Sequence, residues 1–229
     1  GFGLALGVAL MTLLFLVELA LGWVRITGTL QPRSGFLVRF AGLVAVFVVV
    51  GVYEELLLRG YLLTNAAEGL VGRLGERGAV VGATLLSSLV FGLAHANNPN
   101  ATAVSTAAIV LAGVMLAAGY VLTGELAIPI GVHVTWNVFQ GSVYGFPVSG
   151  LTTPATLISV RQTGPTLVTG GRFGPEGGLI LYLGLAVGIA LTWWWVRREE
   201  DEVRFRTEIA DPDLRNPQRP ARTGTDDDE

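Results

Sequence analysis

The chain contains no cysteine and no lysine. Without cysteine it has no structural disulfide, no thiolate metal site and no cysteine nucleophile. Without lysine it has no serine–lysine dyad. Charged residues make up only 14% of the 229 residues, whereas soluble domains carry about 25%. Histidine is scarce too, since the chain holds only 2, so any imidazole chemistry must use His95 or His133.

Apolar residues dominate what is present, at 51% of the chain with a mean hydropathy of +0.57. Apolar runs recur at the length that a helix needs to cross a bilayer. This pattern excludes a soluble enzyme and predicts an all-α, polytopic membrane helix bundle with about six transmembrane helices. The expected spans are residues 2–24, 37–65, 79–96, 102–122, 126–146 and 177–197.

The composition divides the chain into a helical bundle, residues 1–198, and a charged tail, residues 199–229, that we expect to be solvated and disordered. Within the bundle, residues 147–176 are rich in Gly, Pro and Thr. We expect an exposed connection there, or an element that gates or pairs with an extended substrate. A turn signal at 162–165 predicts a short hairpin within residues 155–169.

Three polar motifs interrupt the apolar spans, and each covers one helical turn. They are Glu54-Glu55-x-x-x-Arg59, Phe91-x-x-x-His95 and His133-x-x-x-Asn137. Residues four apart share one face of a helix. Ionisable groups in hydrocarbon cost several kcal/mol each, so they usually face a polar interior and serve a function. The motifs therefore predict one buried site built from three helices.

The two adjacent carboxylates point about 100° apart on a helix, so only one of them faces the centre of the site. Glu55 with Arg59 fits a structural ion pair, but one pair needs one carboxylate and the chain places two at this depth. Burial suits an unpaired carboxyl to general-base work, and Glu54 is the better candidate for it. Both stay candidate catalytic residues. Arg59 is expected to orient and balance charge, because a guanidinium does not give up its proton.

The two histidines lie on separate spans, each with a patterned neighbour. A neutral imidazole can bind a divalent metal, shuttle a proton or donate a hydrogen bond to a developing oxyanion. Asn137, one turn after His133, offers an amide donor on the same face. Phe91, one turn before His95, is expected to shape the pocket rather than to react.

A metal ion is one option for this site. Glu54, His95 and His133 can supply three ligands and leave one position open, as in catalytic zinc sites. The chain has no His-Glu-x-x-His motif, however, and these three residues come from three different helices. One divalent metal such as zinc and a metal-free site both remain open.

The three motifs, in this order and in separate spans, resemble those of the CPBP family, the CAAX-protease and bacteriocin-processing group of intramembrane endopeptidases. The resemblance covers roughly residues 37–197, the expected catalytic core, and includes the Gly174-Pro175-Glu176-Gly177-Gly178 entry to the last span. It implies hydrolysis of a peptide bond in or beside the bilayer. Eukaryotic relatives remove the last three residues of prenylated proteins, whereas prokaryotic relatives generally lack such substrates. Relatives often have one or two more helices, and we expect that helices can precede Gly1.

The family is described both as metalloproteases and as metal-free glutamate proteases. Our hypothesis is that Glu54 and His95 hold the nucleophilic water, and that Glu54 takes its proton. His133 and Asn137 then stabilise the tetrahedral oxyanion. This assignment follows the resemblance as well as the chemistry of the side chains.

Two other functions compete with proteolysis. One is a non-catalytic membrane scaffold or immunity-type protein that binds a peptide without cutting it. The other is a small-solute or proton transporter with a carboxylate and imidazole relay, although transport favours internal repeats and broken helices. We expect a multi-pass protein of a prokaryotic cell membrane, with membrane lipids and a peptide or membrane-protein substrate as partners and no nucleic acid.

Overall fold

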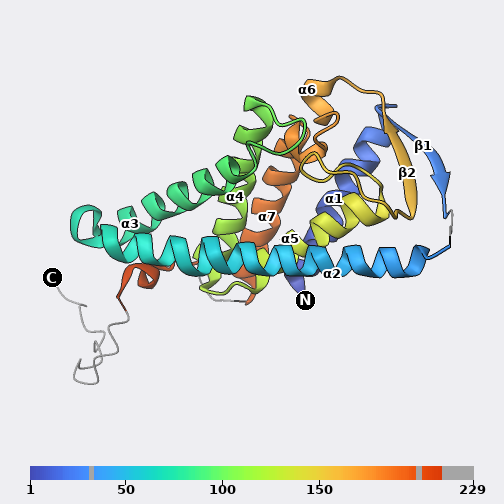
Figure 1. The fold of residues 1–229 in the computed structure, drawn as a ribbon. Helices are drawn as coiled ribbons and strands as arrows, with labels where there is room; N and C mark the ends of the chain where they lie inside the picture. The colour runs from blue at the N-terminus through green and yellow to red at the C-terminus, as the bar shows by residue number, and fades with distance from the viewer. Residues whose placement is uncertain (31–33, 200–202, 213–229) are drawn as a thin grey trace.

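The structure is a computed structural model that describes residues 1–30, 34–199 and 203–212. Its helices pack around a core in which α1 lies against α5 and α7 (Figure 1). The α-helices are α1 (Phe2–Ala20), α2 (Phe36–Glu55), α3 (Thr64–Ala94), α4 (Ala103–Thr123), α5 (Ala127–Asn137), α6 (Thr166–Thr169) and α7 (Leu181–Glu199). Wider π-helical turns form η1 (Leu56–Leu63) and η2 (Val138–Val143), and short 3₁₀ turns form η3 (Pro175–Gly177) and η4 (Thr207–Ala210).

The predicted helical class is correct for most of the chain. Within the described residues, three helical stretches are long and apolar enough to cross a membrane, and they are Phe2–Ala20, Phe36–Ala94 and Ala103–Thr123. Helices also occupy the other expected spans, as the second half of α3, as α5 with η2, and as α7. The number of six membrane crossings stays a prediction.

The longest helical stretch runs from α2 through η1 into α3 and reverses once. The reversal is at Gly75, whose φ of 67° and ψ of 169° no helix accommodates. Glycine adopts this conformation without steric cost. In Figure 1, α2 runs along the base, and the second half of α3 rises away from it after the reversal. The end of α3 is thereby brought back towards the middle of the molecule, where the bundle core lies.

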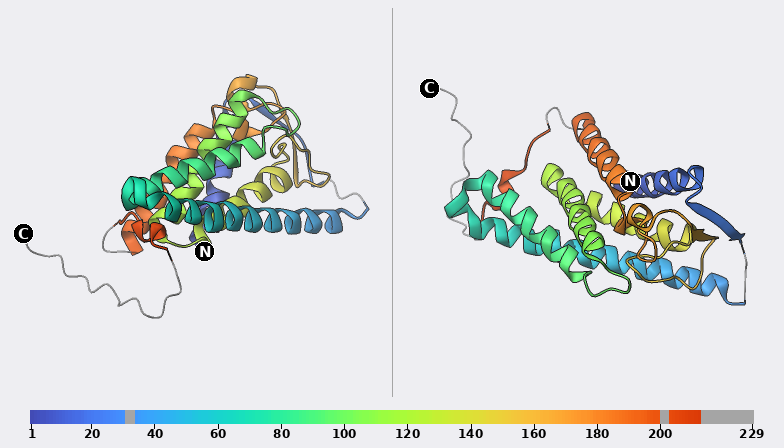
Figure 2. Two further views of the ribbon diagram at one scale, coloured as in Figure 1. Left: turned by 60° about the vertical axis from the view of Figure 1, so that its left-hand side comes forward. Right: turned by 90° about the horizontal axis from the view of Figure 1, so that it is seen from above.

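A small sheet departs from the all-α prediction. Strand β1 (Val24–Thr29) follows α1 and pairs antiparallel with β2 (Ile158–Gln162). The predicted hairpin within residues 155–169 is therefore wrong, because β2 pairs with a strand that lies far away in the sequence. The pairing ties the long loop before α7 to the end of α1, as Figure 2 shows from two further sides.

Part of the predicted disordered tail is folded. Within residues 203–212, η4 packs on α3, and Ala210 is fully buried against Ala79 and Val80. The guanidinium carbon of Arg77 lies 5.7 Å from the ring centre of Phe205. The high charge of this segment predicted disorder, but its apolar side chains, among them Phe205 and Ile209, pack against α3. The rest of the tail, residues 200–202 and 213–229, lies outside the described residues.

Candidate active site

The site begins where α2 meets α5, and a glycine permits their close approach. A Cβ atom on Gly51 would lie 2.6 Å from Cγ2 and 3.1 Å from the backbone nitrogen of Val134. Only a residue without a side chain fits there, as is common where membrane helices touch. The contact brings the last turn of α2, which ends at Glu55, against the turn of α5 that carries His133.

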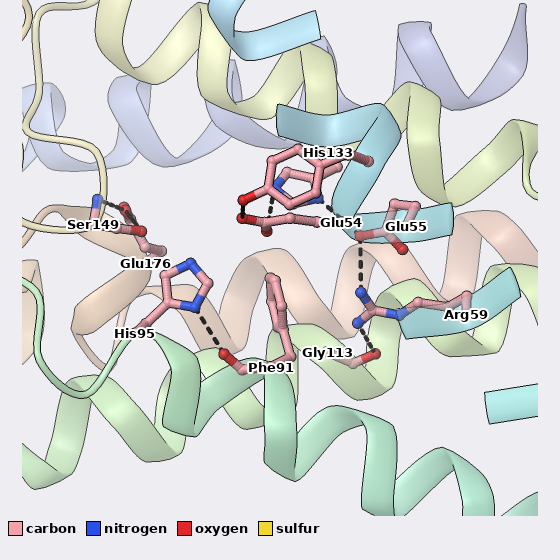
Figure 3. Close-up of polar contacts among 10 residues, drawn as sticks. Glu54, Glu55, Arg59, Phe91, His95, Gly113, His133, Ser149 and Glu176 are labelled. Carbon is pink, nitrogen blue, oxygen red and sulfur yellow. Dashed lines mark hydrogen bonds and ion pairs between the residues drawn. The ribbon is translucent and has the colours of Figure 1, made fainter. Parts of the chain in front are cut away.

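Glu55, Arg59 and His133 form one buried network (Figure 3). Arg59 Nη1 donates to Glu55 Oε1 at 2.8 Å, and His133 Nδ1 donates to the same oxygen at 2.8 Å. Arg59 Nη2 donates to the carbonyl oxygen of Gly113 on α4 at 2.9 Å. The Glu55 and Arg59 side chains are both 0% exposed, so the carboxylate balances a charge that water does not reach.

One wide turn lies within the first motif, and a second directly follows the third motif. The chain passes from α2 into the π-helix η1 after Glu55, and from α5 into the π-helix η2 after Asn137. π-Helical turns are rare in proteins, and those that occur often lie at functional sites. Here they carry Arg59 and Gln140, two polar side chains that contact the ends of the motif helices.

Phe91 fills the space between the arginine and both imidazoles. Its ring centre lies 4.9 Å from that of His95 and 5.8 Å from that of His133, with the rings edge to face. The guanidinium carbon of Arg59 lies 4.8 Å from the Phe91 ring centre. His95 Nδ1 donates to the Phe91 carbonyl oxygen at 2.7 Å. The prediction that Phe91 shapes the pocket agrees with this position.

The two adjacent carboxylates have different surroundings. Glu54 Oε1 accepts from the Tyr53 hydroxyl at 3.1 Å, and Glu54 Oε2 lies 3.8 Å from His133 Nε2. Its side chain is 16% exposed, whereas that of Glu55 is not exposed at all. Glu54 lines a cavity of about 460 Å³, which we call the active-site cavity. Glu55 and Arg59 lie behind its wall.

The active-site cavity is lined by residues that we expect to hold the water and by residues that we expect to stabilise the oxyanion. Its polar lining includes Glu54 of α2, His95 at the end of α3, and His133 and Asn137 of α5. Phe91 contributes to the same wall, and the remainder is mainly apolar. Four of the five candidate catalytic residues therefore face one space, and Glu55 is the exception.

Residues 36–139 match the family model described as type II CAAX prenyl endopeptidase Rce1-like. The matched segment begins at the first residue of α2 and contains all three motifs. This segment belongs to the Rce1-like family. The family predicted from the motifs is confirmed. Comparisons with curated proteins and with solved structures found no match.

Glu176 and Gln140, which lie beyond the Rce1-like segment, form a further buried polar pair at the site, and the sequence analysis missed their roles. Glu176 of η3 is 5% exposed and lines the active-site cavity. Its Oε2 accepts from the side-chain amide of Gln140, and its Oε1 accepts from the backbone N–H of Ser149 at 2.5 Å. Burial raises the pKa of Glu176 from 4.5 to about 7, although these hydrogen bonds act in the opposite direction.

Weak sequence signals point to both residues. Gln140 lies one turn beyond Trp136 and Asn137, on a continuation of the motif helix. Glu176 is the one carboxylate in the Gly/Pro/Thr-rich loop 147–176. Neither signal gives a partner, because the partners come from separate loops.

The three proposed metal ligands do not form a common group among the described residues. Two of the proposed ligands, Glu54 and His133, approach to 3.8 Å, but His95 does not join them in a common group. Nδ1 of each imidazole donates to an oxygen of the protein, which leaves Nε2 as the nitrogen that can bind a ligand. Across residues 1–30, 34–199 and 203–212, no group of three His, Asp or Glu side chains is close enough to share a metal ion.

A second and larger space lies beside the active-site cavity. This outer hollow has a volume of about 870 Å³ and is bounded by the loops around residues 100–105, 145–153 and 160–177. It contains none of the motif residues. Thr152 and Thr153 line both spaces.

Proposed function

We propose that the chain is an intramembrane endopeptidase that hydrolyses a peptide bond in or beside the bilayer. The observation that carries the proposal is the gathering of Glu54, His95, His133 and Asn137 around one largely apolar cavity. The Rce1-like family of the segment that contains them supports the same reaction class.

In the proposed reaction, Glu54 and His95 hold a water molecule against the scissile carbonyl. The Glu54 carboxylate takes one proton from this water while the oxygen attacks the carbonyl carbon. When the C–N bond breaks, Glu54 returns the proton to the leaving amine nitrogen. Peptide and water thus give one carboxyl and one amine product, and no further reactant is needed.

The oxyanion of the tetrahedral intermediate is stabilised from α5. Asn137 donates its amide N–H, and His133 donates from Nε2. Because Nδ1 of His133 already donates to Glu55, the ring makes both bonds only as an imidazolium. The Glu55 carboxylate, 2.8 Å from Nδ1, stabilises that charge while Glu54 holds the proton taken from the water. We therefore assign Glu55 and Arg59 to positioning and charge balance, outside the reacting atoms.

The apolar part of the active-site cavity suits a lipid-anchored substrate. Leu43, Val46 and Val50 of α2 face Ile109 and Met115 of α4 across it. We propose that a prenyl group or another apolar anchor lies between these helices while the adjoining peptide bond reaches Glu54. The prenyl endopeptidase family of residues 36–139 supports this choice.

A matched pair of fluorogenic peptides tests the proposal in detergent or liposomes. Both have one sequence, and one carries a farnesyl cysteine before its last three residues. Cleavage located by mass spectrometry is expected for the farnesylated peptide, and it is expected to disappear in Glu54→Gln and His95→Ala. Glu125→Gln, an exposed change of the same type on the α4–α5 link, is the control. Unchanged cleavage in Glu54→Gln would sink the proposed site.

A chelator separates the two forms of the mechanism in the same assay. Because the three proposed ligands do not form a common group, we expect cleavage to survive a strong chelator. If the chelator abolished cleavage and added zinc restored it, the nucleophilic water would be bound by a metal ion instead.

A further inference from the structure

One loop segment forms a wall of the active-site cavity, residues 147–153, and we call it the strap. Val148, Ser149 and Leu151 line the cavity, together with Thr152 and Thr153. The two threonines also line the outer hollow. The strap therefore lies between the two spaces and is part of the partition that separates them.

A buried carboxylate binds the tip of the strap. Glu176 accepts from the Ser149 backbone N–H at 2.5 Å and from the Gln140 amide, which also donates to the Pro147 carbonyl oxygen at 2.6 Å. The carboxylate thus contacts the strap both directly and through Gln140. Figure 3 places Glu176 and Ser149 beside His95.

The same network connects the strap to the helix that carries the oxyanion residues. Trp136 Nε1 donates to Gln140 Oε1 at 2.7 Å, and Trp136 is itself buried in the wall of the cavity. Asn137 follows it directly on α5. A shift of the Gln140–Glu176 pair therefore alters the strap and the cavity wall beside Asn137 together.

The backbone of the strap is held in a conformation that it does not favour by itself. Ser149 has a φ of +46°, which is uncommon for a residue with a side chain, and Gly150 follows with a φ of +83°. The Gly150 N–H donates to the Phe173 carbonyl oxygen at 2.7 Å. A Cβ atom on Gly150 would lie 1.8 Å from the carbonyl oxygen of Pro99. Such backbone persists only where its surroundings hold it.

We propose that Glu176 is a positioning residue that anchors the strap as a wall of the peptide-binding cleft. Both of its carboxylate oxygens accept hydrogen bonds from the protein, so it holds a loop rather than the reacting water. Loss of the carboxylate frees the strap, joins the active-site cavity to the outer hollow and weakens peptide binding. Only this last, kinetic consequence rests on the proposed peptidase function.

The natural absence of cysteine gives a clean probe of strap movement. Val148 is 7% exposed and faces the cavity, so Val148→Cys places a thiol where the closed strap shields it. Maleimide labelling rates are measured for purified protein in detergent with Val148→Cys alone, and with Glu176→Gln added. We expect labelling to accelerate about tenfold or more with Glu176→Gln. The new side chain has one acceptor oxygen instead of two, so its N–H₂ group faces either the Ser149 N–H or the Gln140 amide, and one hydrogen bond is lost.

Two further variants control this measurement. Glu125→Gln makes the same atomic change on an exposed link and should leave labelling of Val148→Cys unchanged. Adding Gln140→Glu to Glu176→Gln restores a donor–acceptor pair between the two side chains but removes the donor to the Pro147 carbonyl oxygen, so labelling should slow only in part. Equal rates with and without Glu176→Gln would overturn the proposal.

Kinetics with the farnesylated peptide separate positioning from catalysis. Glu176→Gln is expected to raise KM about tenfold and to change kcat far less. A fall in kcat with unchanged labelling would place Glu176 at the reacting atoms, and the positioning role would be wrong. The labelling experiment needs no substrate, so it still decides the anchoring role if the peptidase function fails.

Discussion

Nδ1 of His133 and Nη1 of Arg59 both lie 2.8 Å from one oxygen atom, Oε1 of Glu55. A single carboxylate oxygen thus joins α5 to η1 and fixes which imidazole nitrogen faces the cavity. Its partner oxygen, Oε2, has no hydrogen-bond partner among the described residues. A change at Glu55 therefore acts on stability and on the site geometry together.

Replacing Glu55 by Gln is expected to destabilise the protein by about 3–5 kcal/mol, because Arg59 is then buried without a counter-charge. The free energy of unfolding in a denaturing detergent titration measures the effect. The double variant Glu55→Gln with Arg59→Met removes both charges and should recover much of the loss. Equal stability of Glu55→Gln and the natural chain would contradict the paired arrangement.

The α2–α5 contact predicts opposite outcomes for two glycines of one helix. Gly51→Ala should cost about 1–3 kcal/mol and lower activity, because the added methyl group forces α2 away from Val134. Gly42→Ala meets no atom within 4 Å and should leave stability unchanged or raise it by up to about 1 kcal/mol. Unfolding and cleavage are measured for both. Similar effects at the two positions would show that helix propensity, and not close approach, dominates.

Asn137→Ala tests the oxyanion site without a change of charge. Removing one oxyanion donor costs about 3–4 kcal/mol of transition-state stabilisation, so kcat should fall about 100-fold or more. The melting temperature should change little. Asn65→Ala, an exposed asparagine whose amide donates to the Tyr61 carbonyl oxygen, serves as the matched control. Cleavage at the natural rate in Asn137→Ala would remove this residue from the mechanism.

Glu176 predicts a pH dependence of stability. Its pKa is raised from 4.5 to about 7 in the folded protein, so the folded state binds the proton more tightly than the unfolded state does. The resulting stabilisation is complete below pH 4.5 and is lost as the pH rises through 7. The unfolding free energy of the natural chain relative to Glu176→Gln should therefore decline between these values, by about 3 kcal/mol at most. An increase with pH would contradict the assigned direction.

His95 is the titratable group that lies beside Glu176 from α3. Because this imidazole lies beside the Glu176 carboxyl, it is removed as a control. The comparison is therefore repeated in a His95→Ala background. The decline should persist there if Glu176 is its source.

The convergence of the motif helices could be predicted from the sequence for a simple reason. Polar side chains are costly in an apolar helix, so Glu54, His95 and His133 had few places to face except one another. The spacing also predicted that only one of the adjacent glutamates faces the centre of the site. Glu54, the candidate preferred from the sequence, lines the cavity, whereas the position of His133 on another helix determines the partners of Glu55.

The parts that escaped prediction depend on contacts between distant segments. Pairing of β1 with β2 joins residues around 26 and 160, and neither strand carries a local signal for its partner. In the sequence, Glu176 is a carboxylate in a loop and Gln140 is an amide on a helix, and nothing local indicates that they bind each other or that Glu176 binds Ser149. The folding of η4 depends in the same way on an apolar surface of α3 that charge content does not reveal.

The burial pattern of α2 has a consequence for how a substrate arrives. This helix buries only Phe47, Gly51 and Glu55, which lie along one narrow stripe. Leu43, Val46 and Val50 line the active-site cavity from the same helix, whose other residues are partly or fully exposed. The lipid-anchored substrate that we propose would then meet the enzyme by lateral diffusion in two dimensions. The quantity that governs the turnover rate is its mole fraction in the bilayer, and added inert lipid slows the reaction by surface dilution at constant bulk concentration.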